Sequence, residues 1–187
     1  MTNLQHEERL QKTFQNVNEW LKFAEAKNFG LLTLNAAMVI GITQIGLTHE
    51  SIIYKACYYI FIPLSGLSFI FPLISLFPVL SRIEKGTFVK GWIDQFCNLI
   101  DKEVGFENIH FYGYLKGIDE AEFESKYLTK VDSSEQFSQF EKELVVQILY
   151  NSRITWLKYQ FFKLGAFFFG LGVVASIIAL PILKLAN

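Results

Sequence analysis

The feature that most constrains this chain is the stretch from Ser134 to Leu183. Its first part, Ser134 to Lys163, has neither Gly nor Pro, and its apolar residues recur at the spacing of a helix. Its last part, Leu164 to Leu183, has no charge over twenty positions, and twenty helical residues span about 30 Å, the thickness of a bilayer's hydrocarbon core. The sequence therefore predicts one helix that begins in water, at a cap formed by Ser133 or Ser134, and ends in lipid.

Two further uncharged runs are long enough to cross a bilayer. The first extends from Asn28 to Thr48 and the second from Ala56 to Ser81. The second run contains Pro63, Pro72 and Pro78, and each proline removes a hydrogen bond from a helix. We therefore expect two spans close together in the chain, of which the second is bent.

These runs and the polar segments around them predict an all-α membrane protein. Residues 1–28 have the pattern of an N-terminal amphipathic helix, which lies either along the membrane surface or against the cytosolic part. We expect residues 29–81 to form a two-span transmembrane hairpin and residues 82–163 a small helical cytosolic sensor segment. Residues 164–183 then form a third transmembrane helix that continues the sensor helix.

The sensor segment contains two shorter helical patterns. Ile83 to Val104 is amphipathic, and Asp119 is placed to cap a short helix from Glu120 to Leu128. Between them, residues 105–117 form an aromatic-rich connector. About eighty residues in three helices are enough to cover a small core.

The placement of Lys and Arg indicates which ends face the cytosol, because cytosolic flanks of membrane spans are rich in basic residues. The N-terminal segment holds four, the short connection one, and the flanks of the middle segment six. In chain order these are Arg9, Lys12, Lys22 and Lys27; Lys55; and Arg82, Lys85, Lys90, Arg153, Lys158 and Lys163. We therefore expect the N-terminus and the middle segment in the cytosol.

Composition and motifs argue against several classes of function. The net charge of −1 lacks the basic excess of a protein that binds a nucleic acid polymer. The three His have no metal-ligand partner at usable spacing, and no Gly-rich phosphate loop or nucleophile motif is present. We therefore predict a protein that is not an enzyme, needs no metal or other cofactor, and has the lipid bilayer as a partner.

Four polar residues of the last long helix lie on one stripe. They are Gln147, Asn151, Thr155 and Lys158, at intervals of three and four residues. Amides hydrogen-bond base edges, a lysine neutralises phosphate, and the neighbouring Arg153 is able to clamp a phosphate with two hydrogen bonds. The stripe is therefore interpreted as a ligand-binding face, and the alternative is a stripe that faces water.

The aromatic connector offers a second set of candidate ligand contacts. His110, Phe111, Tyr112 and Tyr114 are of the types that stack on a base, although such clusters also form cores and membrane-interface packing. The basic residues near the membrane and the acidic remainder of the middle segment fit an anionic ligand held between them. They fit equally well a basic ring attracted to anionic headgroups.

Small residues in the last span form a face that lets helices approach closely. These are Gly172, Ala175, Ser176 and Ala179. The face packs either within one three-helix protomer or between protomers of a homo-oligomer. In the first span, Asn35 is a polar group that needs a partner in lipid.

Two motifs resemble the Pycsar transmembrane effector family. Residues Ser152 to Tyr159 (Ser-Arg-Ile-Thr-Trp-Leu-Lys-Tyr) are similar to its Ser-Arg-Ile…Lys-Tyr signature. Residues Ala24 to Leu32 (Ala-Glu-Ala-Lys-Asn-Phe-Gly-Leu-Leu) resemble its acidic-x-Lys…Leu-Leu motif, with Glu25 where Asp is expected and Asn28 where a small residue is expected. This motif adds Lys27 to the candidate ligand-binding residues. The spacing of the spans is similar across nearly the whole chain.

The resemblance implies a bacterial inner-membrane effector of antiphage defence. Such an effector binds a cyclic pyrimidine mononucleotide, of the cyclic UMP or cyclic CMP type, and impairs the membrane, which arrests growth or causes abortive infection. The residues by themselves indicate only a cytosolic sensor joined to membrane spans. The alternative is a non-catalytic structural membrane subunit that scaffolds partner proteins through its acidic residues.

Overall fold

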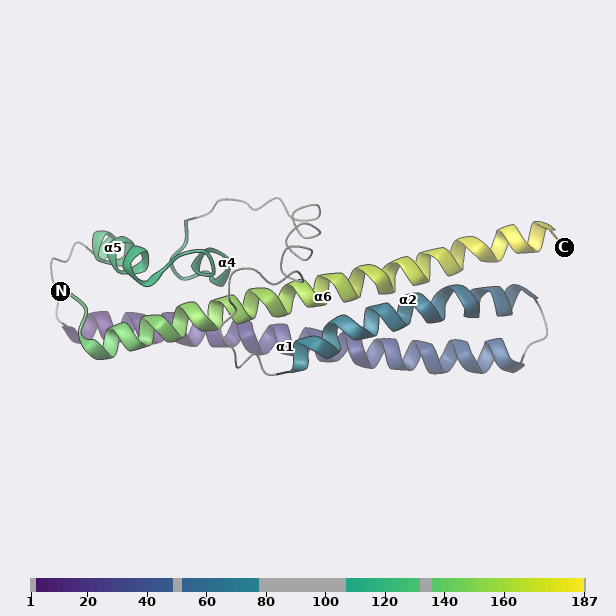
Figure 1. The fold of residues 1–187 in the computed structure, drawn as a ribbon, viewed down its shortest axis with the longest axis horizontal. Coiled ribbons are helices and arrows are strands. Elements are labelled where there is room, and N and C mark those ends of the chain that lie inside the picture. The colour runs from purple at the N-terminus through teal and green to yellow at the C-terminus, as the bar shows by residue number, and fades with distance from the viewer. Residues whose placement is uncertain (1–2, 49–51, 78–106, 132–135, 187) are drawn as a thin grey trace. The chain divides into compact units, whose positions relative to one another are not determined.

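The computed structural model describes residues 3–48, 52–77, 107–131 and 136–186, and every regular element in these ranges is an α-helix (Figure 1). The helices are α1 (Asn3–Thr48), α2 (Ile52–Leu76), α4 (Tyr112–Leu115), α5 (Glu120–Val131) and α6 (Gln139–Ala186). Three of them, α1, α2 and α6, are long and apolar enough to cross a membrane. The prediction of an all-α fold is confirmed for the described residues, which contain three candidate membrane spans. The predicted helix from Ile83 to Val104 lies outside the described residues.

Helix α1 joins two segments that the sequence predicted separately, the amphipathic N-terminal helix and the first span. Its buried side chains explain the continuity. Leu10, Val17, Ala24 and Leu31 recur every seven residues and are all buried. A seven-residue spacing keeps side chains on one face of a helix. This face therefore continues from the charged half of α1 into the uncharged half without a break.

The described residues divide into two compact units. Unit 1 contains α1 up to Ala24, the segment 107–131 with α4 and α5, and α6 up to Gln160. Unit 2 contains α1 from Glu25, all of α2, and α6 from Phe161. Helices α1 and α6 therefore each contribute residues to both units.

Unit 1 has an apolar core built from α1, α5 and α6, closed by residues that flank α4. Leu10 and Val17 of α1 are fully buried in it. The core also contains Phe123 and Tyr127 of α5 and Ile148 of α6. Of the two alternatives for the N-terminal helix, the structure thus shows packing against the sensor segment.

Two capping interactions set the ends of α5 and α6. The predicted cap of α5 is confirmed, because the Asp119 carboxylate accepts a hydrogen bond from the Glu122 amide at 2.8 Å. The predicted cap of α6 is wrong. Helix α6 begins at Gln139, and Ser138 and Glu141 form a reciprocal capping box.

Unit 2 joins its three helices through buried polar side chains. The Asn35 amide of α1 donates to the Ser68 hydroxyl at 2.8 Å, and the Ser65 hydroxyl donates to the Asn35 carbonyl at 3.0 Å. Ser68 in turn donates to the backbone carbonyl of Gly165 in α6 at 2.7 Å. Asn35 has therefore found the polar partners that a buried amide in lipid needs.

Gly165 lies where α6 comes closest to the backbone of α2. A Cβ at this position would lie 3.0 Å from the carbonyl oxygen of Ser68 and 3.0 Å from the ring of Pro72. Pro72 has no N–H, so it leaves the Ser68 carbonyl without its usual helical donor. Glycine is thus required here by close approach to a backbone group.

Candidate functional site

Seven of the eight predicted ligand-binding residues lie in unit 1, and Lys27 lies in unit 2. The Lys27 ammonium is 5.4 Å from the centre of the Phe162 ring, a cation–π contact within unit 2. The structure therefore gives Lys27 a packing partner of its own.

The polar stripe of α6 is engaged within unit 1. The Asn151 amide donates to the Asn18 side chain of α1 at 2.8 Å, and the Thr155 hydroxyl donates to the Asn151 backbone carbonyl at 2.7 Å. Thr155 is fully buried and Lys158 is only 8% exposed. The stripe is therefore exposed at Gln147 and buried at Thr155 and Lys158. Between them, Asn151 connects α6 to α1.

Arg153 lies beside this stripe and is also engaged. Its guanidinium donates a hydrogen bond at 3.2 Å to the backbone carbonyl of Ile118, just before α5. Arg153 therefore ties α6 to the connector between α4 and α5.

Aromatic side chains gather around α4. Tyr112 stacks on Tyr159 of α6 with ring centres 5.3 Å apart, and Trp20 of α1 contacts both Tyr112 and Phe111. Burial, and then the neighbouring Tyr159, raise the pKa of Tyr112 to about 12, so its hydroxyl keeps its proton at neutral pH. The cluster contains the π-faces that stack on a base.

Tyr114 does not belong to this aromatic cluster. Its hydroxyl accepts a hydrogen bond from Lys126, which also pairs with Glu122 at 2.8 Å. The hydrogen bonds that Lys126 donates to Glu122 and Tyr114 raise its pKa. Of the four residues predicted to stack on a base, Phe111 and Tyr112 therefore lie in this cluster, whereas Tyr114 contacts Lys126 and His110 contacts Thr13.

One cavity of unit 1, here called the amide cavity, lies between α1 and α6 and has a volume of about 530 Å³. Its described lining residues are Gln11, Phe14, Gln15, Asn18, Glu19, Lys22, Phe140, Glu143, Leu144 and Gln147. The predicted residue Gln147 is among them. The amides suit a base edge, but the carboxylates Glu19 and Glu143 outnumber the single cation Lys22 and disfavour a phosphate.

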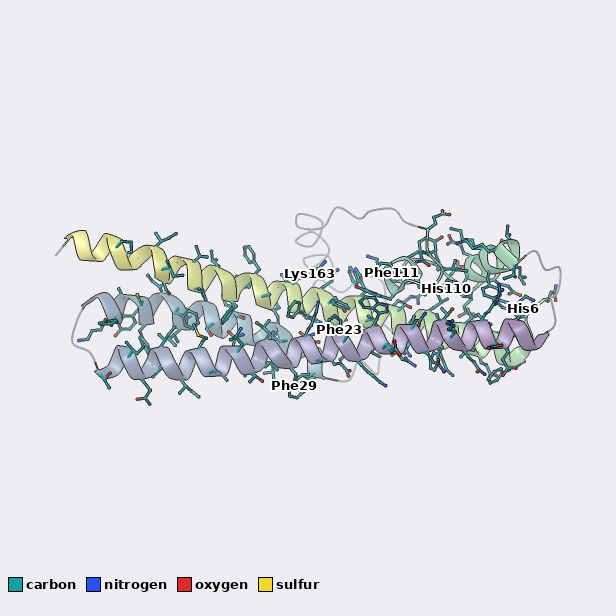
Figure 2. All side chains as sticks on the ribbon, turned by 180° about the vertical axis from the view of Figure 1, so that it is seen from behind. His6, Phe23, Phe29, His110, Phe111 and Lys163 are labelled. Carbon is teal, nitrogen blue, oxygen red and sulfur yellow. The ribbon has the colours of Figure 1, made fainter. Side chains whose placement is uncertain are left out.

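A second cavity, here called the basic cavity, has a volume of about 510 Å³. Its described lining residues are Arg9, Lys12, Thr13, Asn16, Ile109, His110, Tyr127, Lys130 and Val131. They include three cations and the predicted residue His110, and no carboxylate. His110 extends toward α1 from the segment before α4 (Figure 2).

The electrostatics of His110 confirm that the cations of this cavity converge. Desolvation, followed by the positive charges of Lys130, Arg9 and Lys12, lowers the pKa of His110. Its Nδ1 lies 2.8 Å from the Thr13 hydroxyl, which also lies 3.1 Å from the Arg9 carbonyl. A hydroxyl has one proton, so when it donates to that carbonyl, Nδ1 is the donor and Nε2 of the neutral ring is left as an acceptor.

Comparison with known protein families identifies the family of this chain. The family model described as the Pycsar effector protein domain (PycTM) matches residues 9–183. The chain belongs to the Pycsar effector family. No matching curated protein or solved structure was found. Pycsar effectors are non-catalytic membrane effectors of cyclic-nucleotide antiphage defence, and the prediction that the chain is not an enzyme is confirmed.

In this Pycsar effector, the residues that carry the family resemblance are largely interior. Ser152 is fully buried and donates to the Ile148 carbonyl at 2.7 Å, and Tyr159 is stacked on Tyr112. In the first motif, Ala24 and Asn28 are both fully buried. These residues hold α1 and α6 in place within their units, whereas all the described lining residues of the two cavities lie outside the motifs.

Sequence reasoning missed the basic residues of the basic cavity. Arg9 and Lys12 were assigned to an amphipathic helix, and Lys130 comes from a distant part of the sequence. The available signal was the spacing of Arg9, Lys12 and Asn16, since these positions share a face at 3.6 residues per turn.

Proposed function

We propose that unit 1 binds a cyclic pyrimidine mononucleotide, of the cyclic UMP or cyclic CMP type, and that unit 2 responds by impairing the bacterial inner membrane. The observation that carries this proposal is the family match over residues 9–183, which extends across both units and both of the helices that they share. The growth arrest or abortive infection that follows would stop phage production in the infected cell.

In this proposal, helices α1 and α6 transmit nucleotide binding in unit 1 to the membrane-impairing response of unit 2. Asn18 and Asn151 join the two helices in unit 1, and Asn35 and Gly165 are joined through Ser68 in unit 2. A ligand shifts a conformational equilibrium only by binding one state more tightly than the other. The nucleotide would therefore act by favouring one packing of α1 and α6 in unit 1, and the same two helices would transmit this preference to unit 2.

The predicted ligand-binding residues take two roles in this proposal. Gln147 lines the amide cavity and His110 lines the basic cavity, and each would contact a nucleotide bound in its own cavity. Asn151, Arg153 and Thr155 make hydrogen bonds within unit 1 and, together with the buried Lys158, would hold the helix that responds.

Membrane damage by three spans requires several protomers, because three helices enclose no pore. Within the protomer, Gly172 already faces α2, where a Cβ would lie 3.3 Å from Leu64 and from Phe61. This packing favours the intra-protomer interpretation of the small-residue face formed with Ala175, Ser176 and Ala179. A homo-oligomer would instead use the outward apolar side chains of α6. Those side chains include Leu171, Val174, Ile177 and Ile178.

Purified protein in proteoliposomes with an imposed potential and a voltage-sensitive dye tests the proposal. Cyclic UMP or cyclic CMP on the side of unit 1 should collapse the potential. The combined variant Arg153→Ala with Lys158→Ala should abolish the response, and Lys142→Ala, an exposed lysine of α6, should respond like the wild type. Melting temperatures without ligand show whether the combined variant folds, and Arg153→Lys tests the charge alone.

Two outcomes would count against the proposal. An undiminished response of the combined variant would exclude these two residues from the response. Failure of the wild type to respond, together with no thermal shift in any cyclic nucleotide, would favour the structural subunit that scaffolds partner proteins.

A further inference from the structure

The basic cavity combines three properties of an anion site. Its described lining has Arg9, Lys12 and Lys130 without a carboxylate. Lys130 is hydrogen-bonded only to a neutral group, the Glu107 backbone carbonyl at 3.4 Å. No ion pair to Arg9, Lys12 or Lys130 is present among the residues that the structure describes. Three cations that converge without a counterion repel one another, and a bound anion would relieve this repulsion.

The cavity also supplies directional donors and a suitable size. Arg9 offers a planar fork of N–H groups that matches a phosphate, and the two lysines offer point charges. Thr13 orients the His110 ring at its edge through a 2.8 Å contact. A volume of about 510 Å³ lies within the range of small-ligand sites, about 300–1,000 Å³.

The amide cavity lies on a different face of α1 and has the opposite charge balance. Its described lining holds Glu19 and Glu143 against Lys22 alone. A phosphate would be repelled there and attracted to the basic cavity. The difference between the two cavities therefore selects one place for an anion in unit 1.

We infer that the basic cavity, through its cations Arg9, Lys12 and Lys130, is a phosphate-binding site that holds α1 against α5. This inference rests on the proposed function where the phosphate is that of the cyclic nucleotide. The cyclic diester of a nucleotide and the headgroup of an anionic phospholipid present the same chemistry. Either anion would neutralise the cations that α1 and α5 contribute and strengthen the packing of α1 in unit 1.

Charge reversal at exposed positions tests the site without disturbing the core. Lys12 and Lys130 are both exposed, so Lys12→Glu with Lys130→Glu should fold. The matched control is Lys142→Glu, an exposed lysine of α6 that lines neither cavity. Each full-length protein in neutral detergent is titrated with cyclic UMP, cyclic CMP, inorganic phosphate or short-chain phosphatidylglycerol, and its melting temperature is recorded.

The inference predicts that the double variant loses at least tenfold in affinity for the anion that stabilises the wild type, while the control is unchanged. Loss confined to the cyclic nucleotides identifies them as the source of the phosphate. Loss of affinity confined to phosphatidylglycerol identifies the lipid as the source of the phosphate. If, in addition, the wild type binds no cyclic nucleotide, the proposed function is contradicted, but the phosphate site is still supported.

Two results would overturn the inference. The first is binding of a cyclic nucleotide with wild-type affinity by the double variant, which leaves the proposed function intact and places the phosphate elsewhere. The second is a wild type that none of the four anions stabilises.

Discussion

Units 1 and 2 share two helices but differ in the side chains that they expose. Unit 1 buries Leu10, Phe123 and Ile148, and it leaves its cations exposed around the basic cavity. Unit 2 buries Phe61 and Leu164 as well as Asn35 and Ser68, and most of the exposed large apolar side chains of the described residues belong to it. The exposed surface therefore changes along α1 and α6, from charged in unit 1 to apolar in the candidate membrane spans of unit 2, while the helices continue.

The difference in exposed surface also bears on which interactions hold the helices together in each unit. In water, burial of apolar surface drives packing, at roughly 25 cal/mol per Å². Lipid is as apolar as the side chains, so close approach of backbones and hydrogen bonds between helices must replace it. Gly165 and the Asn35–Ser68 pair in unit 2 are examples of these two contributions. The following predictions test the comparison.

The largest expected effect comes from one substitution made at two places on α6. Ile148→Ala opens a cavity in the core of unit 1, because Ile148 is fully buried, and should destabilise the protein by about 2–5 kcal/mol. Ile178→Ala removes the same atoms from a side chain that is 54% exposed and should cost less than about 0.5 kcal/mol. Denaturant titration in detergent measures both. Equal losses would mean that Ile178 packs against protein.

A smaller effect is expected from adding a methyl group to two glycines of unit 2. Gly165→Ala places a Cβ 2.9 Å from Leu31 and 3.0 Å from the Ser68 carbonyl, and overpacking of this kind costs about 1–3 kcal/mol. At Gly170 no heavy atom lies within 4 Å of the added Cβ, so Gly170→Ala should stabilise the helix by up to about 1 kcal/mol. Thermal unfolding in detergent compares the two. A neutral Gly165→Ala variant would show that α2 and α6 are not closely packed.

The smallest effect concerns the charge of His110. Its pKa is lowered by burial and by Lys130, Arg9 and Lys12, so NMR titration should give a midpoint below the usual value of about 6.5. A lowered pKa means that the folded state favours neutral His110. The contribution of His110 to the free energy of unfolding is therefore fully present above about pH 6.5, and it is lost as the pH falls through the pKa of His110 in the folded state. Lys130→Gln should move the midpoint upward. A midpoint at or above 6.5 in the wild type would contradict the convergence of the three cations.

Much of the fold could be predicted because the decisive signals are local. Uncharged runs identified the spans, and Asp119 identified the start of α5. The start of α6 was missed because Ser133 and Ser138 both precede a Gln or Glu at the third following position. The choice between them depends on tertiary contacts. Phe137 packs on Tyr127, and its amide donates to the Glu124 carboxylate at 3.2 Å, so this residue is not helical.

The candidate site was less accessible to sequence reasoning because it depends on which faces meet. The stripe from Gln147 to Lys158 was identified correctly as one face, but no pattern indicated that Asn151 would pair with Asn18. Likewise, no local pattern joins Lys12 to Lys130. Periodicity shows which side chains share a face of one helix, and only packing shows which faces form a cavity.

The central claim is that α6 carries the state of unit 1 into unit 2 as one uninterrupted helix, and hydrogen–deuterium exchange of the full chain in nanodiscs tests it most directly. The amides from Thr155 to Phe168 should exchange slowly throughout, since α6 is continuous from Gln139 to Ala186. Addition of the cyclic nucleotide should change protection on both sides of Gln160. Fast exchange between Gln160 and Leu164, or a nucleotide effect that ends before Phe161, would contradict the claim.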